Sequence, residues 1–319
     1  MNIQPTVQEA GQRYLQRTET RKQQMRSVKQ NGIRAVETDD RIETRRQLLQ
    51  VDNASTLEAV LEKNDLLHVN YLTKGITVSR SICRLRVQDT HQPWSGTGWM
   101  VSPTLLITNN HVLPSLADAK VGLAEFNYQE DINSTVGPIH TFRLSPEEFF
   151  FTSKELDFTL VAVKPTQVNG AGAALSEFGH LQLIEQSGKA LLQESLSIIQ
   201  HPGGDTKQIA MRNNQLVDIF DNFAHYLTDT KKGSSGSPVF NDSWQVVALH
   251  HAGVPKLDEK GRWLAKGGRL WKEEWGYDAV DWIANEGIRI SSIFALLKAK
   301  SDWTAEEKLL LLEMGVSVS

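Results

Sequence analysis

One short segment, Gly-Ser-Ser-Gly-Ser-Pro at residues 233–238, has the composition of a loop that could hold a nucleophile. Glycines beside a serine allow a tight turn that exposes the hydroxyl and points main-chain N–H groups toward a bound carbonyl. A serine nucleophile needs such donors to stabilise the oxyanion formed during acyl transfer. Because glycine and serine also cluster in surface turns, the segment predicts catalysis only if a base and an acid accompany it.

His111 and Asp157 could supply that base and that acid. His111 lies in Thr-Asn-Asn-His-Val at 108–112, and histidine is the side chain whose pKa suits general-base catalysis near neutral pH. Asp157 directly precedes the apolar stretch 158–163, where a carboxylate is costly unless it is paired. We therefore expect the two side chains to meet.

Three segments together resemble the active-site motifs of the chymotrypsin-like (trypsin-like) serine peptidase family. Residues 96–112 are similar to the histidine motif, 156–163 to the aspartate motif and 233–240 to the serine motif, in the order of the family. The similarity covers roughly residues 76–295 and is strongest to the bacterial, disulfide-free, glutamyl-endopeptidase-like branch. It implies a mainly β fold of two six-stranded antiparallel β-barrels, with an added N-terminal helical region and a C-terminal helix.

The resemblance implies a role for each site residue. Ser235 would attack the substrate carbonyl, while His111 takes the serine proton and later returns it to the leaving amine. Asp157 would hold the imidazole tautomer and stabilise the imidazolium. The main-chain N–H groups of Gly233 and Ser235 would form the oxyanion hole. The alternatives are sequence neighbours, Glu155 for the acid and Ser237 for the nucleophile.

Substrate binding is predicted for a second group of residues. The resemblance implies that the strand through His250, His251 and Gly253 pairs with the substrate backbone as an added β-strand. Asp229 lies where the trypsin branch keeps the acid that binds a basic P1 side chain. Thr230 and His250 match the positions at which the glutamyl branch binds a P1 carboxylate. These signals oppose each other, and the sequence slightly favours Arg or Lys at P1.

Ser234 departs from the family pattern. Zymogens of the trypsin branch have an aspartate at this position, where it binds a newly cut N-terminal amine, and a serine cannot form that salt bridge. We therefore expect control through the helical N-terminal region, by a partner protein or an upstream ligand. Residues 1–50 contain ten Lys or Arg and six Asp or Glu, a charge of +4, which fits either a solvated helix or a docking arm for an acidic partner.

The remaining chain predicts three parts: a helical regulatory or docking region at 1–72, the peptidase domain at 73–298 and a helical tail at 299–319. Capping boxes at Thr6, Ser55 and Thr304 predict helix starts. From about Ile76, short apolar segments separated by Gly, Pro and Asn predict an all-β core. Residues 253–276 form a polar and aromatic insertion, and 278–285 are expected to be helical.

Composition narrows the classes of function. With 319 residues and 40% hydrophobic side chains, the chain can form one large or two modest domains. A net charge of −4 gives no general argument for nucleic acid, and no apolar run is long enough to span a membrane. The lone cysteine, Cys83, is expected in the core, and the absence of disulfides and of an apolar leader predicts a cytoplasmic location. No spacing typical of metal ligands or of a phosphate loop is present, so we expect neither metal nor cofactor.

The predicted function is that of an intracellular serine endopeptidase acting on protein or peptide substrates, with a regulatory partner bound through residues 1–72. The alternative is a non-catalytic or weakly catalytic peptide-binding or chaperone-like module on the same fold. A third interpretation, compatible with the first, treats the peptidase as the effector of a bacterial signalling or defence assembly.

Overall fold

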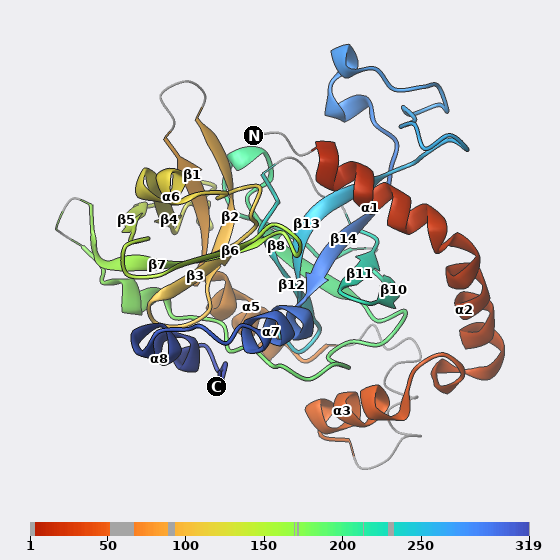
Figure 1. The fold of residues 1–319 in the computed structure, drawn as a ribbon, viewed down its shortest axis with the longest axis horizontal. Helices are drawn as coiled ribbons and strands as arrows, with labels where there is room; N and C mark the ends of the chain where they lie inside the picture. The colour runs from red at the N-terminus through yellow and green to blue at the C-terminus, as the bar shows by residue number, and fades with distance from the viewer. Residues whose placement is uncertain are drawn as a thin grey trace.

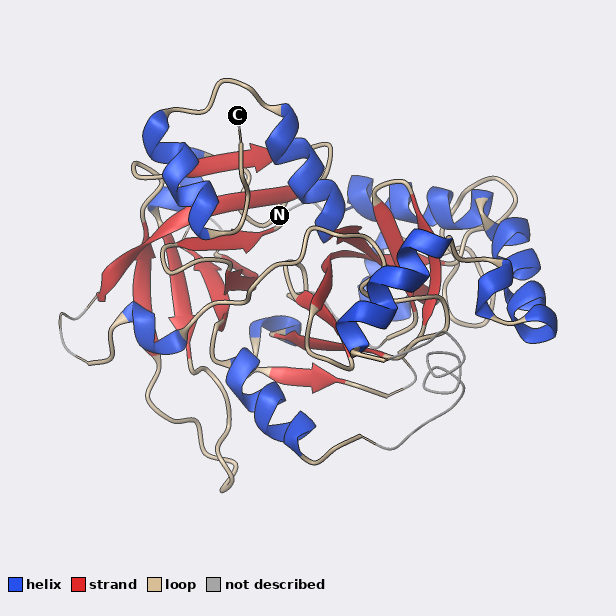
Figure 2. Cartoon of the chain, turned by 90° about the horizontal axis from the view of Figure 1, so that it is seen from below, coloured by secondary structure: helices blue, strands red, loops and turns tan. Residues whose placement is uncertain are grey.

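The computed structural model describes residues 4–51, 67–88, 93–168, 170, 172–212, 214–228 and 233–318. Two antiparallel sheets of seven strands each lie side by side, with helices from both ends of the chain packed around them (Figures 1 and 2). The prediction of a mainly β fold is confirmed. The helix expected after Ser55 lies outside the described residues. None of the described helices is long and apolar enough to cross a membrane.

The first sheet closes into a barrel. Its strand order is β3-β2-β1-β4-β5-β7-β6, and β3 also pairs with β7, which joins six strands in a ring as expected. Within the described ranges, strand β6 pairs only with β7 and extends the sheet beyond the ring. The strands are β1 Ile82–Val87, β2 Trp94–Met100, β3 Leu105–Thr108, β4 Gly122–Phe126, β5 His140–Leu144, β6 Phe150–Ser153 and β7 Phe158–Gln167.

The second sheet differs from the expected six-stranded closed barrel. It has seven strands in the order β10-β11-β14-β13-β12-β8-β9, with no ladder joining β9 to β10 within the described residues. A helix packs against the edge strand β10, and covering an edge removes the need to close the sheet. The strands are β8 Leu196–Gln200, β9 Gln208–Ala210, β10 Leu216–Phe220, β11 Phe223–Tyr226, β12 Pro238–Asn241, β13 Val246–Pro255 and β14 Trp282–Arg289.

The N-terminal helices follow the outside of the second sheet. Helix α1 (Gln4–Gln16) contacts β13, α2 (Thr18–Asn31) contacts β10, and α3 (Asp39–Leu49) continues around the same side (Figure 1). Helix α1 begins at Gln4, so Thr6 is inside the helix rather than its cap. The short helices are η1 Ile33–Ala35, α6 Leu116–Lys120, η2 Leu175–Phe178, η3 Pro202–Gly204, η4 Glu273–Trp275 and η5 Tyr277–Ala279.

Two segments near the ends of the sheets have a different structure from the one expected. Residues Asn70–Ser79 form helix α5, so the β region begins at Ile82 and not at about Ile76. Residues 278–285, expected to be helical, contribute to η5 and to β14. Strand β14 pairs with both β11 and β13, and these central ladders override local helix propensity.

The C-terminal segment forms α7 (Ile290–Ala299) and α8 (Ala305–Glu313). The capping box expected at Thr304 is present, with its hydroxyl accepting from Glu307 N–H and the Glu307 carboxylate accepting from Thr304 N–H. One apolar cluster joins residues of both sheets to this tail, including Trp99, Phe240 and Leu311. Cys83 is fully buried in a second cluster, inside the first barrel, as expected of a core residue.

Helix α3 is fastened to the second sheet by a buried ion pair. Arg45 donates to Glu194 through Nε at 2.8 Å and Nη2 at 2.6 Å, with side-chain exposures of 3% and 8%. Burial raises the pKa of Glu194, although Arg45 opposes the shift. Removing one partner of such a pair leaves a charge without compensation.

We expect Arg45→Met to lower the free energy of unfolding by about 3 kcal/mol, because the Glu194 carboxylate would remain buried without its cation. Arg46→Met is the control, since Arg46 pairs with the half-exposed Glu43 and its loss should cost much less than that of Arg45. Urea denaturation measures both. Equal losses for the two variants would show that the buried pair does not fasten α3.

Candidate active site

The first barrel brings His111 and Asp157 together. His111 follows strand β3 and Asp157 precedes β7, and these strands pair with Thr108 opposite Thr159, so both residues lie at one end of the barrel. The Asp157 carboxylate accepts from the His111 main-chain N–H at 2.9 Å, and its Oδ2 lies 2.7 Å from His111 Nδ1. Glu155 is exposed. The acid that contacts the histidine is therefore Asp157.

The backbone around Asp157 is fixed in an uncommon conformation. Its φ is 46°, in the left-handed region that few residues other than glycine, Asn and Asp adopt readily. The side chain of Asn109 donates to the Asp157 carbonyl at 2.9 Å and holds this turn. Such conformations persist only where surrounding contacts impose them, and they are concentrated at functional sites.

The serine loop belongs to the second sheet but is held by the first. Thr97 of β2 donates its main-chain N–H to the Ser235 carbonyl at 2.9 Å and its hydroxyl to the Gly233 carbonyl at 3.0 Å. Gly233 and Gly236 have φ of 96° and 89°, conformations that favour glycine. A side chain at Gly236 would collide with the Thr97 carbonyl. The two sheets therefore meet at this loop.

The contacts within the loop distinguish its two candidate nucleophiles. The Ser237 hydroxyl is fully buried and donates to the Ser234 carbonyl at 2.6 Å, whereas Ser235 keeps 8% of its surface exposed. Among the described residues, no main-chain oxygen accepts from the N–H of Gly233 or of Ser235.

His111 Nε2 is the atom that would take the serine proton. It is buried and makes no hydrogen bond within the described part of the chain. A side chain added at Gly96 would touch both Val112, next to His111, and the Ser235 carbonyl, which places the serine loop beside the histidine segment. Hydrogen bonds of this kind are often long in unliganded sites and shorten when substrate binds.

The side chain of His251 lies between two buried carboxylates. Its Nδ1 lies 3.1 Å from Asp157 Oδ2 and its Nε2 lies 2.8 Å from Glu286 Oε1, with 2% of the side chain exposed. The side chain is therefore committed to two buried carboxylates, and the expected pairing of its strand with the substrate backbone stays a prediction. Only its backbone remains for pairing with a substrate strand.

Mutual hydrogen bonds and charges keep His251, Asp157 and Glu286 ionised. Burial would lower the pKa of His251, but the hydrogen bonds and charges of Asp157 and Glu286 raise it to about 9. Burial would raise the pKa of Asp157, but His111 and His251 hold it well below the usual value. Burial would also raise the pKa of Glu286, and hydrogen bonds from His225, His251 and Arg13 hold that pKa well below the usual value too. The stability that a protonated His251 contributes is complete below its unfolded pKa of about 6.5 and is lost as pH rises through about 9.

The predicted substrate pocket is described in part. Asp229 and Thr230 lie outside the described residues. His250 is buried, its Nδ1 is 2.8 Å from the Tyr226 hydroxyl, and burial together with the neighbouring His251 and His111 lowers its pKa to about 3. Gly253 pairs with Asn285 of β14, and the indole ring of Trp282 packs where a side chain at 253 would lie.

Sequence reasoning did not identify Glu286. Its carboxylate accepts from His251 at 2.8 Å and from His225 Nε2 at 2.9 Å, and its side chain is fully buried. The available signals were an acid inside the apolar stretch 282–289 and two adjacent histidines at 250–251. An acid in an apolar strand is costly without a partner, so the two signals could have been connected.

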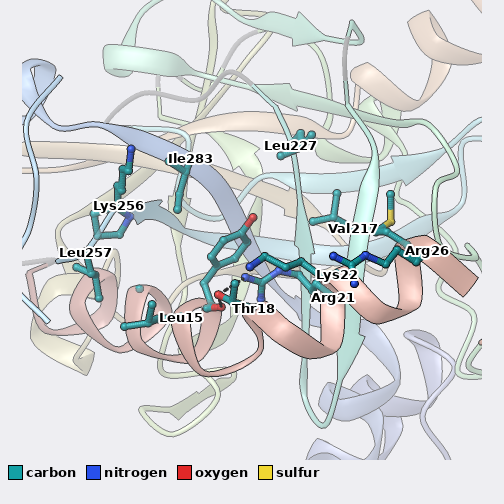
Figure 3. A pocket seen from close by; sticks show the side chains of 14 residues that line it. Leu15, Thr18, Arg21, Lys22, Arg26, Val217, Leu227, Lys256, Leu257 and Ile283 are labelled. Carbon is teal, nitrogen blue, oxygen red and sulfur yellow. Dashed lines mark hydrogen bonds between the residues drawn. The ribbon is translucent and has the colours of Figure 1, made fainter. Parts of the chain in front are cut away.

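A separate groove of about 580 Å³ lies between helices α1 and α2 and the second sheet (Figure 3). Its walls are mostly apolar, including Leu15, Val217 and Ile283, and Arg21 and Lys22 lie along α2 beside it. His111, Asp157 and Ser235 do not line it. The groove is therefore distinct from the candidate active site.

The chain is similar to one family model and to several known proteins. A family model described as a trypsin-like peptidase domain matches residues 96–249. A protein of Sinorhizobium fredii named y4fB is 40% identical over 257 residues, which are 75% of this chain and 38% of that protein. A glutamyl endopeptidase of Staphylococcus aureus is 22% identical over 241 residues, 75% of this chain and 64% of that protein. The chain thus spans less than two thirds of the length of either relative.

Among solved structures, the active form of a protease from M. tuberculosis aligns with a TM-score of 0.47 and 15% identity. The alignment covers 74% of this chain and 86% of that one.

We expect Gly236→Ala to destabilise the protein by about 3 kcal/mol, because the added methyl group meets the Thr97 carbonyl and the backbone is left-handed. Gly179→Ala is the matched control: its φ is 64° but nothing lies within 4 Å of the added atom, so it should cost about 1 kcal/mol. Thermal unfolding measures both. A Gly236→Ala variant as stable as Gly179→Ala would contradict the described packing of the serine loop.

Proposed function

The chain belongs to the trypsin-like serine peptidase family, and from this premise we propose that it is an intracellular serine endopeptidase acting on protein substrates through an acyl-enzyme intermediate. One observation carries the proposal: His111 Nδ1 lies 2.7 Å from Asp157 Oδ2, at the barrel end against which β2 holds the Ser235 loop. This arrangement supports a base, an acid and a nucleophile contributed by three separate segments, as acyl transfer requires.

In the proposed reaction, Ser235 Oγ attacks the substrate carbonyl carbon while His111 Nε2 takes the hydroxyl proton. The N–H groups of Gly233 and Ser235 donate to the oxyanion, and each such donor is worth about 3–4 kcal/mol of transition-state stabilisation. His111 then gives its proton to the leaving amine as the peptide C–N bond breaks. Water attacks the resulting ester, with His111 again as base, which releases the acid and restores Ser235.

The intracellular part of the proposal is supported by cysteine usage. The chain has one cysteine, Cys83, whose thiol is buried and whose pKa is raised by that burial, so the fold does not depend on oxidation. Cell fractionation that recovered the native protein only outside the cell would contradict this part.

We propose an acidic P1 preference from the hydrogen bonding of His250. Burial raises the pKa of Tyr226 well above its usual value, so its hydroxyl stays protonated and can donate to His250 Nδ1. The proton of the neutral imidazole then resides on Nε2, which can donate to a carboxylate. This favours Glu over the basic P1 residue that Asp229 suggested, and it agrees with the name of the S. aureus relative.

We expect Ser235→Ala to abolish covalent labelling by a fluorophosphonate probe, because the proposed nucleophilic oxygen is removed. Ser237→Ala is the matched control and should retain labelling within about tenfold of wild type, since its hydroxyl bonds within the loop. Intact-mass spectrometry measures the adduct. A folded wild-type protein that binds extended peptides without labelling or turnover would favour the non-catalytic alternative.

We expect cleavage of a peptide library to occur after Glu, with replacement of Glu by Gln at P1 reducing kcat/KM by about tenfold or more. The reason is the loss of a charge-assisted hydrogen bond from His250. Mass spectrometry of the products identifies P1 directly. Cleavage predominantly after Arg or Lys would show instead that Asp229 determines the pocket.

A further inference from the structure

A continuous series of buried charges leads from the candidate active site to the N-terminal helix. Asp157 Oδ2 lies 3.1 Å from His251 Nδ1, and His251 Nε2 lies 2.8 Å from Glu286 Oε1. Arg13 of α1 then donates to both oxygens of Glu286, through Nε at 3.0 Å and Nη2 at 2.6 Å. Four side chains of alternating charge therefore connect residues that are far apart in sequence.

Glu286 and His251, in the middle of this series, have almost no contact with solvent, and Arg13 at its end is partly exposed. The side chain of Glu286 is fully buried, that of His251 is 2% exposed, and that of Arg13 is 24% exposed. A buried charge is destabilising unless a partner compensates it. Each charge in the series therefore depends on its neighbours, and the Glu286 carboxylate needs both Arg13 and the imidazolium of His251.

We propose that Arg13 is a positioning residue of the catalytic site, so that docking of helix α1 holds the carboxylate of Asp157 in place through Glu286 and His251. The inference rests on the proposed peptidase function and adds the control element to it. Arg13 does not touch a reacting atom. It neutralises Glu286, Glu286 keeps His251 protonated, and the His251 N–H fixes the carboxylate oxygen that also faces His111.

Other ionisable groups packed around this series complete its balance. His225 of β11 donates to Glu286 at 2.9 Å and lies 3.9 Å from Asp218 of β10. Asp218 is bound in turn by Arg17 of the same N-terminal segment at 2.7 Å, and Arg21 lies 3.7 Å from it. His250, beside His251, is neutral because its pKa is about 3. Besides His251 of β13, the cations that face these acids are Arg13 of α1, Arg21 of α2 and Arg17 between the two helices.

Helix α1 is held by contacts that a ligand or partner could compete for. Val7 and Ala10 pack in one apolar cluster with Ala252 of β13 and Trp263 of the 253–276 insertion. Gln8 donates to the Gly261 carbonyl at 3.0 Å. Displacing α1 from this insertion would withdraw Arg13 from Glu286, which gives the helical region a direct effect on the active site.

The chain offers a matched pair of arginines for the test. Arg13 and Arg17 each bind one buried carboxylate through Nε and Nη2, Glu286 and Asp218 respectively. Each guanidinium also stacks on a phenylalanine ring, at 4.2 Å and 4.5 Å, and the side chains are 24% and 26% exposed. They differ in that Glu286, the partner of Arg13, contacts His251.

The experiment compares Arg13→Met with Arg17→Met in the full chain, using the rate constant of fluorophosphonate labelling at saturating probe across pH. We expect Arg13→Met to lower this rate constant at least about tenfold with the probe affinity unchanged, and Arg17→Met to lower it less than about threefold. Loss of the Arg13 cation makes the site one charge more negative. The acid limb of the profile should therefore move about half a unit to higher pH in Arg13→Met.

Three results decide the outcome. Partial recovery in Arg13→Lys, which restores the charge but not the two-pronged contact, would support the inference. Equal effects of Arg13→Met and Arg17→Met, with unmoved acid limbs and equal loss of thermal stability, would overturn it while leaving the peptidase function intact. If the wild type is not labelled, the proposed function fails, and the downfield proton resonance of the His111–Asp157 hydrogen bond decides the inference: a shift in Arg13→Met but not in Arg17→Met supports it, and no shift refutes it.

Discussion

The protonated ring of His251, enclosed between the carboxylates of Asp157 and Glu286, is the interaction on which the rest of the site depends. Two buried carboxylates this close would repel each other and protonate if nothing lay between them. The imidazolium supplies one N–H to each, at 3.1 Å and 2.8 Å, and so allows both to stay ionised. The oxygen of Asp157 that His251 contacts is also the one that orients His111.

The basic N-terminal region forms ion pairs with buried acids of the same chain. Its arginines do not only face solvent: Arg13 and Arg17 bind the buried acids Glu286 and Asp218 of the second sheet, and Arg45 binds Glu194, which precedes strand β8. The helices therefore complete the charge balance of that sheet, and α2 also packs on its edge strand β10. Several of the positive charges in residues 1–50 are therefore neutralised by ion pairs within the chain.

The candidate site was predictable from sequence where its signals are local. His111, Asp157 and Ser235 each lie in a short motif, and the capping box at Thr304 predicted helix α8 for the same reason. The contact between Arg13 and Glu286 joins residues 273 positions apart and leaves no pattern in either segment. Residues 278–285 are expected to be helical from local spacing, but 282–285 belong to β14, which pairs with two neighbouring strands distant in sequence.

The protonation state of His251 is the direct test of this charge arrangement. In the Ser235→Ala protein labelled with ¹⁵N-histidine, we expect both ring nitrogens of His251 to remain protonated through neutral pH and to titrate only near pH 9. Such a spectrum would place a fixed cation between the two carboxylates. A His251 ring that is neutral at pH 7, with one nitrogen unprotonated, would contradict the charge series from helix α1 to the catalytic acid.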